Sequence, residues 1–467
     1  MSVFEGLSRR VSIGVLACCL ALLAASLCSQ SPSQDTTEKA FQAAMAAEDR
    51  GDFATAESLL RDLHSKHPGV FAIDESLGLL HVQQEDFEAA LPLLKAAAAE
   101  QPDSDAAHAN FGAALYRLHR DNDALAEFQI AARLNPDNAN TQESLGRLLM
   151  EQHRPAEAAE AFAAAIKLNP DSAGLILDRA QALLDSGQSQ TSVTELTAMP
   201  NVEQSASAQL LLGDAEEKLG SYQRAAEHYA RAVELDPTEA NVWALGVEFL
   251  RHWTFDPAIK EFEAAATKFP NSTRIKLGLG AAYFGGARYA ESIPVFADLL
   301  GADPNNALYA ELLGMACTAV AQGNKERCSA LVDFAQAHPR NAKVSTYAAS
   351  MLLTESSDSD RSALAGKLLT NALGVDPGSA DAHYQMGLLK QNQGDWAGSV
   401  PSLEKAIALK PDLAQAHYRI ALAYWRTGRK QEGQAEMELQ KKYSKQEKED
   451  MDKRLRQITT FIVDVRQ

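Results

Sequence analysis

The sequence predicts an all-α protein built as a solenoid of repeated helical hairpins, and three observations support this fold class. Prolines recur at a constant step, because Pro68, Pro102, Pro136 and Pro170 are each 34 residues apart. Glycines and small residues follow the same interval. Between these marks, apolar residues recur every three or four positions, as they do along one face of a helix. Such an array is one extended object rather than several globular domains.

The first 28 residues differ in composition from the rest. Two arginines precede the uncharged stretch 11–28, and a positive segment followed by an apolar one is typical of an export signal. Three outcomes stay open: a cleaved signal peptide, a lipid attached at Cys18 (where VLAC is similar to the bacterial lipoprotein box), and a retained membrane anchor. In each case we expect export to the periplasm or cell envelope. Residues 29–36 are polar and predict a flexible tether.

Residues 105–138 show why one interval forms a hairpin. The first helical face is made by His108, Phe111, Gly112 and Leu115, and the second by Ala124, Phe128, Ala131 and Leu134. A polar break separates the two faces, and the sequence NPD then ends the second helix, because proline lacks the amide and clashes with the preceding turn. The unit is therefore a helix, a turn, a helix and a stop.

The recurring glycines predict a close contact between the two helices. Glycine inside a helix costs about 1 kcal/mol relative to alanine, so its repetition makes sense only where another helix comes very near. We expect the recurring alanines of the second helix, such as Ala124 and Ala158, to be the counterpart.

Together these residues resemble the tetratricopeptide repeat (TPR) family, whose unit has 34 residues. The matching positions are Gly112, Ala124, Phe128, Ala131 and Pro136, and again Gly146, Ala158, Phe162, Ala165 and Pro170. The resemblance implies a right-handed superhelix of about twelve hairpins. We place the repeats at 37–70, 71–104, 105–138, 139–172, 173–205, 206–238, 239–272, 273–306, 307–341, 342–379, 380–413 and 414–440. They form an N-terminal array, 37–205, and a C-terminal array, 206–440, followed by a capping helix or tail at 441–467.

Charge and motifs argue against several function classes. The formal net charge is −18, which disfavours nonspecific binding to nucleic acid. The sequence has no Walker loop and no G-x-S-x-G, H-E-x-x-H or C-x-x-C motif, so we predict no enzymatic activity and no cofactor. His383 and His417 occupy the same place in neighbouring repeats. No cysteine or carboxylate cluster completes a ligand set beside them, so we predict no metal site.

Two cysteines remain beyond the N-terminal segment. Cys317 lies on the inward stripe of the first helix of its repeat. Aligning its repeat with the one at Gly220 puts Cys328 where Ala225 stands, the small position that faces the first helix. We predict a disulfide between them in an exported protein, and the alternative is a pair of buried free thiols.

The TPR resemblance also implies a binding surface, since in that family the first helices line an inner wall that takes a peptide or a helix from a partner. The candidates here are Asn110, Tyr116, Arg117, Glu143, Arg147, Asp178, Tyr384, Gln391, Tyr418, Arg419 and Trp425. Arg117 and Arg147 are placed to meet an acidic segment. Tyr384, Tyr418 and Trp425 form an aromatic group of the kind that anchors interfaces.

We therefore predict a non-catalytic scaffold that mediates protein–protein interactions in the cell envelope. Its partner would be a protein or peptide in the groove, with no nucleic acid and with a possible membrane tether through the N-terminus. One alternative is a lipoprotein or assembly factor of an outer-membrane, secretion or pilus machine. Another is an accessory subunit of an envelope polysaccharide-synthesis enzyme.

Overall fold

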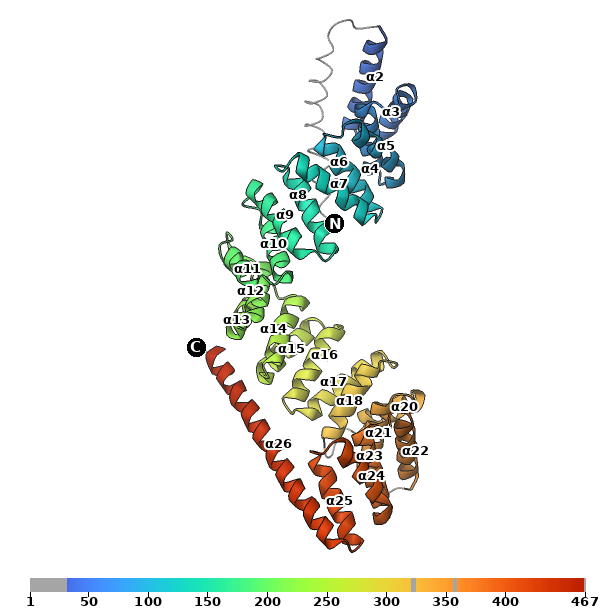
Figure 1. Cartoon of the computed structure of the whole chain (residues 1–467), viewed down its shortest axis with the longest axis vertical. Helices are drawn as coiled ribbons and strands as arrows, with labels where there is room; N and C mark the ends of the chain where they lie inside the picture. Colours follow the sequence, from blue (N-terminus) through green and yellow to red (C-terminus); the bar gives the residue numbers. More distant parts are fainter. Residues whose placement is uncertain (1–31, 321–324, 356–358, 466–467) are drawn as a thin grey trace. The chain divides into compact units, whose positions relative to one another are not determined.

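The computed structural model describes residues 32–320, 325–355 and 359–465. Every regular element in these ranges is a helix (Figure 1), which confirms the predicted all-α fold class. The export signal expected at residues 1–28 lies outside them. Within the described ranges, each helix is too short or too polar to cross a membrane.

The helices follow one another at short intervals. Up to residue 202 they are α2 (Pro32–Asp49), α3 (Phe53–Lys66), α4 (Phe71–Gln83), α5 (Phe87–Glu100), α6 (Asp105–Arg117), α7 (Asp121–Leu134), α8 (Ala139–Glu151), α9 (Pro155–Leu168), α10 (Ala173–Asp185) and α11 (Ser189–Thr197). A 3₁₀ turn, η1 (Val202–Gln204), comes next. Then follow α12 (Ala206–Lys218), α13 (Tyr222–Leu235), α14 (Glu239–Arg251), α15 (Phe255–Lys268), α16 (Thr273–Gly285), α17 (Tyr289–Ala302), α18 (Ala307–Ala319), α19 (Lys325–Cys328), α20 (Ala330–Ala337), α21 (Ala342–Glu355), α22 (Ser359–Val375), α23 (Ala380–Asn392), α24 (Trp396–Leu409), α25 (Ala414–Arg426) and α26 (Lys430–Val465).

Consecutive helices pack in pairs, as the resemblance to TPR proteins implied: α2 with α3, α4 with α5 and so on to α16 with α17. Helix α18 then pairs with the two short helices α19 and α20, and the pairs α21 with α22, α23 with α24 and α25 with α26 follow. We call the first member of each pair a first helix; these are α2, α4, α6, α8, α10, α12, α14, α16, α18, α21, α23 and α25. Within each unit, the second helix of one pair also contacts the first helix of the next, for example α9 with α10 and α15 with α16. Each hairpin thus buries its apolar face against its neighbours.

Local chemistry explains where the helices begin. The Ser104 hydroxyl accepts a hydrogen bond from the Ala107 backbone N–H at 3.2 Å and caps α6, and the Ser272 hydroxyl caps α16 through the Ile275 N–H at 3.0 Å. Such caps satisfy backbone donors that a helix start leaves open. Between the two helices of a hairpin the chain makes a turn with one left-handed residue. This residue is glycine in several repeats, such as Gly220 with φ +77°, because glycine adopts that conformation without strain.

The helices approach closely at the glycines, as predicted. A Cβ built on Gly146 would lie 2.7 Å from the ring of Phe162, and one on Gly246 would lie 2.3 Å from the ring of Phe262. The expected counterpart was wrong, because an aromatic ring, not the recurring alanine, fills the space above each of these glycines. The missing Cβ leaves room for the ring edge, which packs more apolar area than an alanine could.

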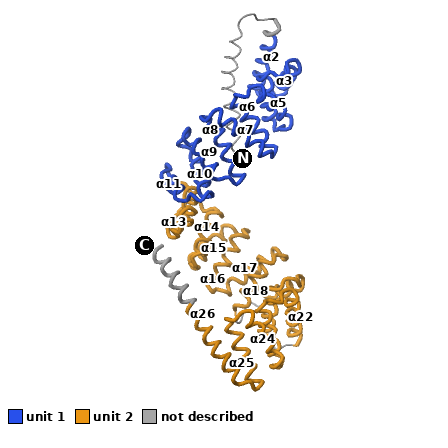
Figure 2. Tube along the Cα trace, viewed as in Figure 1, with its two compact units in different colours: residues 1–202 blue, residues 203–467 orange. Residues whose placement is uncertain are grey.

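The chain forms two compact units, Met1–Val202 (unit 1) and Glu203–Gln467 (unit 2) (Figure 2). Each unit has apolar cores that run through successive hairpins. In unit 1 the largest core joins residues of α5 to α10, and in unit 2 it joins residues of α17 to α23.

The two ends of the helical region differ from the sequence interpretation. Helix α2 begins at Pro32 and so includes most of the expected tether 29–36, which fits the preference of proline for the first turn of a helix. Helix α26 runs without a break from Lys430 to Val465. Residues 441–465 are thus helical and continuous with the second helix of the last hairpin.

Candidate functional site

The candidate surface lies on the first helices. We define the first-helix face as the side chains at the second, fifth, ninth and twelfth residue of each first helix, which share one side of an α-helix. In α8 these are Asn140, Glu143, Arg147 and Met150, and in α25 they are Gln415, Tyr418, Leu422 and Trp425. Most of the candidates named from the sequence lie on this face or directly beside it.

In unit 1 the charged candidates are paired within the chain. One guanidinium nitrogen of Arg147 lies 2.8 Å from Glu143 on its own helix and 3.2 Å from Asp178 on α10. Arg117 places its guanidinium 4.5 Å from the ring centre of Phe87. These cations thus already have partners inside the protein, and Arg147 links two successive first helices.

Two uncharged candidates in unit 1 form similar links. The Tyr116 hydroxyl donates to the Glu151 carboxylate at 2.6 Å, and this bond raises the pKa of Tyr116 to about 12. Asn110 is buried and donates to Glu75 at 3.1 Å. Burial raises the pKa of Glu75 to about 7, although the Asn110 hydrogen bond opposes that rise.

The C-terminal candidates fall into two groups. Gln391 is buried, and its amide donates to the Arg419 backbone carbonyl at 2.9 Å. Burial raises the pKa of the half-buried Tyr384, with the nearby Arg419 opposing it. Tyr418 and Trp425, in contrast, are 44% and 37% exposed.

Sequence reasoning missed a second exposed pair on the same face. Leu308 and Met315 of α18 are 53% and 37% exposed. Like Tyr418 and Trp425, they are seven residues apart, so each pair spans two turns of one helix face. Among the described residues, these four are the large apolar side chains exposed on first helices, and all lie in unit 2. Comparing equivalent positions of the repeats could have found the α18 pair.

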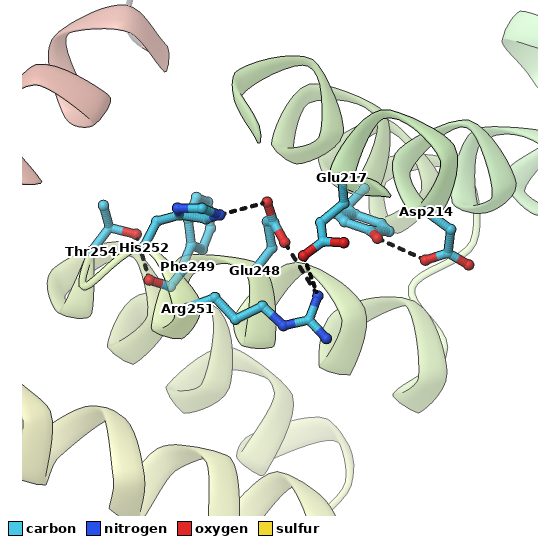
Figure 3. A network of polar contacts seen from close by, with 8 residues as sticks. Asp214, Glu217, Glu248, Phe249, Arg251, His252 and Thr254 are labelled. Carbon is cyan, nitrogen blue, oxygen red and sulfur yellow. Dashed lines mark hydrogen bonds and ion pairs between the residues drawn. The ribbon is translucent and has the colours of Figure 1, made fainter. Parts of the chain in front are cut away.

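A polar network between α12 and α14 was also missed (Figure 3). Glu248 has no exposed surface, and neither of its carboxylate oxygens accepts a hydrogen bond. Its oxygens lie 3.2 Å from His252 Nε2 and 3.8 Å from Arg251 Nη1. Arg251 is closer to Glu217 of α12, at 3.1 Å. Burial, followed by the charge of Glu217, raises the pKa of Glu248 to about 7.

The repeated histidines make polar contacts with other residues of the chain. His417 lies 2.6 Å from the Glu436 carboxylate and 2.8 Å from the Pro411 carbonyl, and His383 lies 3.1 Å from the Pro377 carbonyl. Each ring thus ties its first helix to the turn before it. No group of three histidine, cysteine or acidic residues is arranged to hold a metal ion in the part of the chain that the structure describes.

Cys317 and Cys328 meet as the alignment of repeats predicted. Their sulfur atoms are at bonding distance, 1.90 Å, their Cα atoms are 6.1 Å apart, and both residues are buried. A disulfide between α18 and α19 is therefore possible. Cys18, the candidate for lipid attachment, lies outside the described residues.

Comparison with known families matches most of the repeats. Models described as tetratricopeptide repeat match residues 41–105, 143–196 and 177–240, residues 81–148 and 254–316, and residues 414–447. A model described as TPR repeat matches residues 392–428. No curated protein matches this sequence.

Several solved structures are similar. The structure of Naa15/Naa10 bound to HypK-THB matches with a TM-score of 0.41 and 16% identity, covering 86% of this chain and 68% of that chain. YrrB, a TPR protein with an unusual peptide-binding site, matches with a TM-score of 0.37 and 17% identity, covering 40% and 97%. The Cut9-Hcn1 hetero-tetramer matches with a TM-score of 0.35 and 12% identity, covering 88% and 87%.

Proposed function

Because this chain belongs to the tetratricopeptide repeat family, we propose that it is a non-catalytic scaffold that binds segments of other proteins, and that it does so in the cell envelope. TPR proteins are generally scaffolds of this kind. The binding surface we assign is the first-helix face of unit 2, where a protein or peptide partner would lie across successive first helices.

One observation carries this assignment. The exposed apolar side chains Leu308, Met315, Tyr418 and Trp425 all occupy the first-helix face of unit 2. An exposed ring or aliphatic chain gains about 25 cal/mol for each Å² that a partner covers. Tryptophan and tyrosine at the centre of an interface often supply most of its affinity.

The assignment is tested by affinity capture of the tagged, full-length protein from envelope extract. One variant carries Tyr418→Ala and Trp425→Ala, and a matched variant carries Arg117→Ala and Arg147→Ala. We expect the aromatic variant to lose partners that the wild type and the arginine variant retain. If neither variant loses a partner, the chosen surface is wrong.

The envelope location rests on residues 1–28, where two arginines precede an uncharged apolar stretch. A fusion of residues 1–36 to a reporter that is active only outside the cytoplasm tests export. Replacing Arg9 and Arg10 by glutamate provides the control, and we expect it to abolish reporter activity. Mass spectrometry of the mature N-terminus then distinguishes cleavage, a lipid at Cys18 and retention.

A further inference from the structure

Glu248 is a carboxylic acid at a place where this chain otherwise puts only apolar residues. It is the tenth residue of α14. The tenth residues of α4, α6, α8, α10, α12, α16, α18, α21, α23 and α25 are Leu80, Ala114, Leu148, Ala182, Ala215, Ala282, Ala316, Met351, Leu389 and Ala423, and all are buried. The repeat fold therefore needs no acid here, because ten other first helices have a buried apolar side chain at this position.

The surroundings of Glu248 are poorly suited to a negative charge. The side chain has no exposed surface and its oxygens accept no hydrogen bond. On its own helix, His252 and Arg251 approach it at 3.2 and 3.8 Å. Burial lowers the pKa of His252, which disfavours the charged form of the ring beside Glu248.

The preceding hairpin adds mostly negative charge. Glu217 and Asp214 of α12 both act on Glu248 and disfavour its ionised form. The hydroxyl of Tyr229 on α13 donates a hydrogen bond to the Asp214 carboxylate at 2.7 Å. Arg251 is the favourable cation, and it lies nearer to Glu217, at 3.1 Å, than to Glu248. An ionised Glu248 would therefore lie near the Glu217 carboxylate, with the charge of Asp214 further away on the same helix (Figure 3).

A buried charge without hydrogen bonds is relieved either by protonation or by exposure to water. We propose that the contact of α14 with the preceding hairpin, which packs through α13 and reaches α12 through Arg251 and Glu217, is a proton-controlled joint. It stays closed while Glu248 is protonated and opens more often once Glu248 ionises. Opening would let water reach the carboxylate and separate it from Glu217.

The direction of the pH dependence follows from linkage. The pKa of Glu248 is raised to about 7 in the closed joint and returns to its ordinary value, 4.5, when the joint opens. The closed form therefore holds its proton more tightly, and opening becomes more favourable as pH rises through this window. Between pH 6 and pH 8 these two values make opening about tenfold more frequent.

Hydrogen exchange of the full-length chain tests the joint. Amide exchange in α12 and α14 is measured at pH 6 and pH 8 and corrected for the intrinsic pH dependence of exchange. In the wild type we expect protection to fall about tenfold between the two values. Glu248→Gln, which cannot ionise, should keep the same protection at both. If Glu248→Gln folds poorly, Glu248→Ala replaces it, because alanine stands at the equivalent position of six other first helices.

Glu75→Gln is the matched control, because Glu75 is a buried acid of α4 in unit 1 whose pKa is also raised to about 7. This variant should change the pH dependence of α4 and leave that of α12 and α14 as in the wild type. The proposal is overturned if α12 and α14 show no pH dependence in the wild type. It is equally overturned if the dependence persists in Glu248→Gln, which would assign it to His252.

Discussion

The first-helix faces of unit 1 and unit 2 differ in chemistry, although the hairpins beneath them are built alike. In unit 1 the polar side chains are already partnered, as in the contacts of Arg147 with Glu143 and Asp178. In unit 2 the face exposes apolar side chains, such as Met315 and Trp425. A partner would have to break existing contacts on the first-helix face of unit 1, but on that of unit 2 it would gain free energy by burying apolar surface. The repeat fold thus places the surface, and individual side chains decide where it can bind.

The largest expected effect tests whether the two units share one kind of core. Phe162 in unit 1 and Phe262 in unit 2 are both fully buried against a glycine of their first helix. Replacing either by alanine should cost about 3–5 kcal/mol of unfolding free energy, because each leaves a ring-sized cavity. Urea unfolding measures this loss. Leu134→Ala, at a residue 39% exposed, is the control and should change stability by about 0.5 kcal/mol or less.

A disulfide would distinguish unit 2 further from unit 1. Replacing Cys317 and Cys328 by serine should cost about 2–3 kcal/mol, because the bond closes a short loop in the unfolded chain. The measurement is urea unfolding of oxidised protein, with reduced wild type as the matched control. We expect reduction to bring the wild type to the stability of the variant. Free thiols found by alkylation and mass spectrometry in freshly purified exported protein would contradict the pairing.

Both units contain buried acids, and in unit 1 the effect of such an acid on stability can be tested with variants of Glu75. Its folded pKa, about 7, is above its ordinary value of 4.5, so the folded state loses stability as pH rises from about 4.5 to above 7. The unfolding free energy of Glu75→Gln, relative to that of the wild type, should therefore rise by up to about 3 kcal/mol between pH 4.5 and pH 8. Urea unfolding across this range measures the gain. In Asn110→Ala, loss of the hydrogen bond should move the pH dependence to higher pH, and an unmoved curve would argue against the contact.

The smallest expected effect concerns the ion pairs of unit 1. Arg147 is 38% exposed in its side chain, so Arg147→Ala should cost only about 0–1 kcal/mol. The difference from the wild type should shrink further at high salt, because salt screens exposed charges. Urea unfolding at low and high salt measures both. A larger, salt-independent loss would mean that packing by the aliphatic stem, rather than charge, dominates there.

The sequence was sufficient to predict the hairpins, because each depends on a local pattern: helical spacing, a proline stop and a glycine at the close contact. It also identified Tyr418 and Trp425 on the first-helix face, which the structure leaves exposed. It could not reveal that Arg147 forms an ion pair with Asp178, since that contact depends on how one hairpin is set against the next.

Glu248 shows what a comparison of the repeats with one another can add. Taken alone, it is one of many acidic residues on helices, where a solvated surface is the ordinary expectation. Aligned with the apolar tenth residues of the other first helices, it stands out as an acid at a position that the repeat buries. Its neighbours Glu217 and Asp214 come from the preceding hairpin, so the network depends on how one hairpin is set against the next and cannot be predicted from the alignment.

Site-specific photo-crosslinking tests most directly the claim that unit 2 carries the binding face. A photoreactive phenylalanine derivative is placed at position 315 or 425 in unit 2, and at position 116 or 147 in unit 1, in the otherwise intact chain. We predict that the two positions of unit 2 crosslink the same partner protein in envelope extract, and that the two positions of unit 1 give little of that product. Crosslinks confined to positions 116 and 147 would contradict the account.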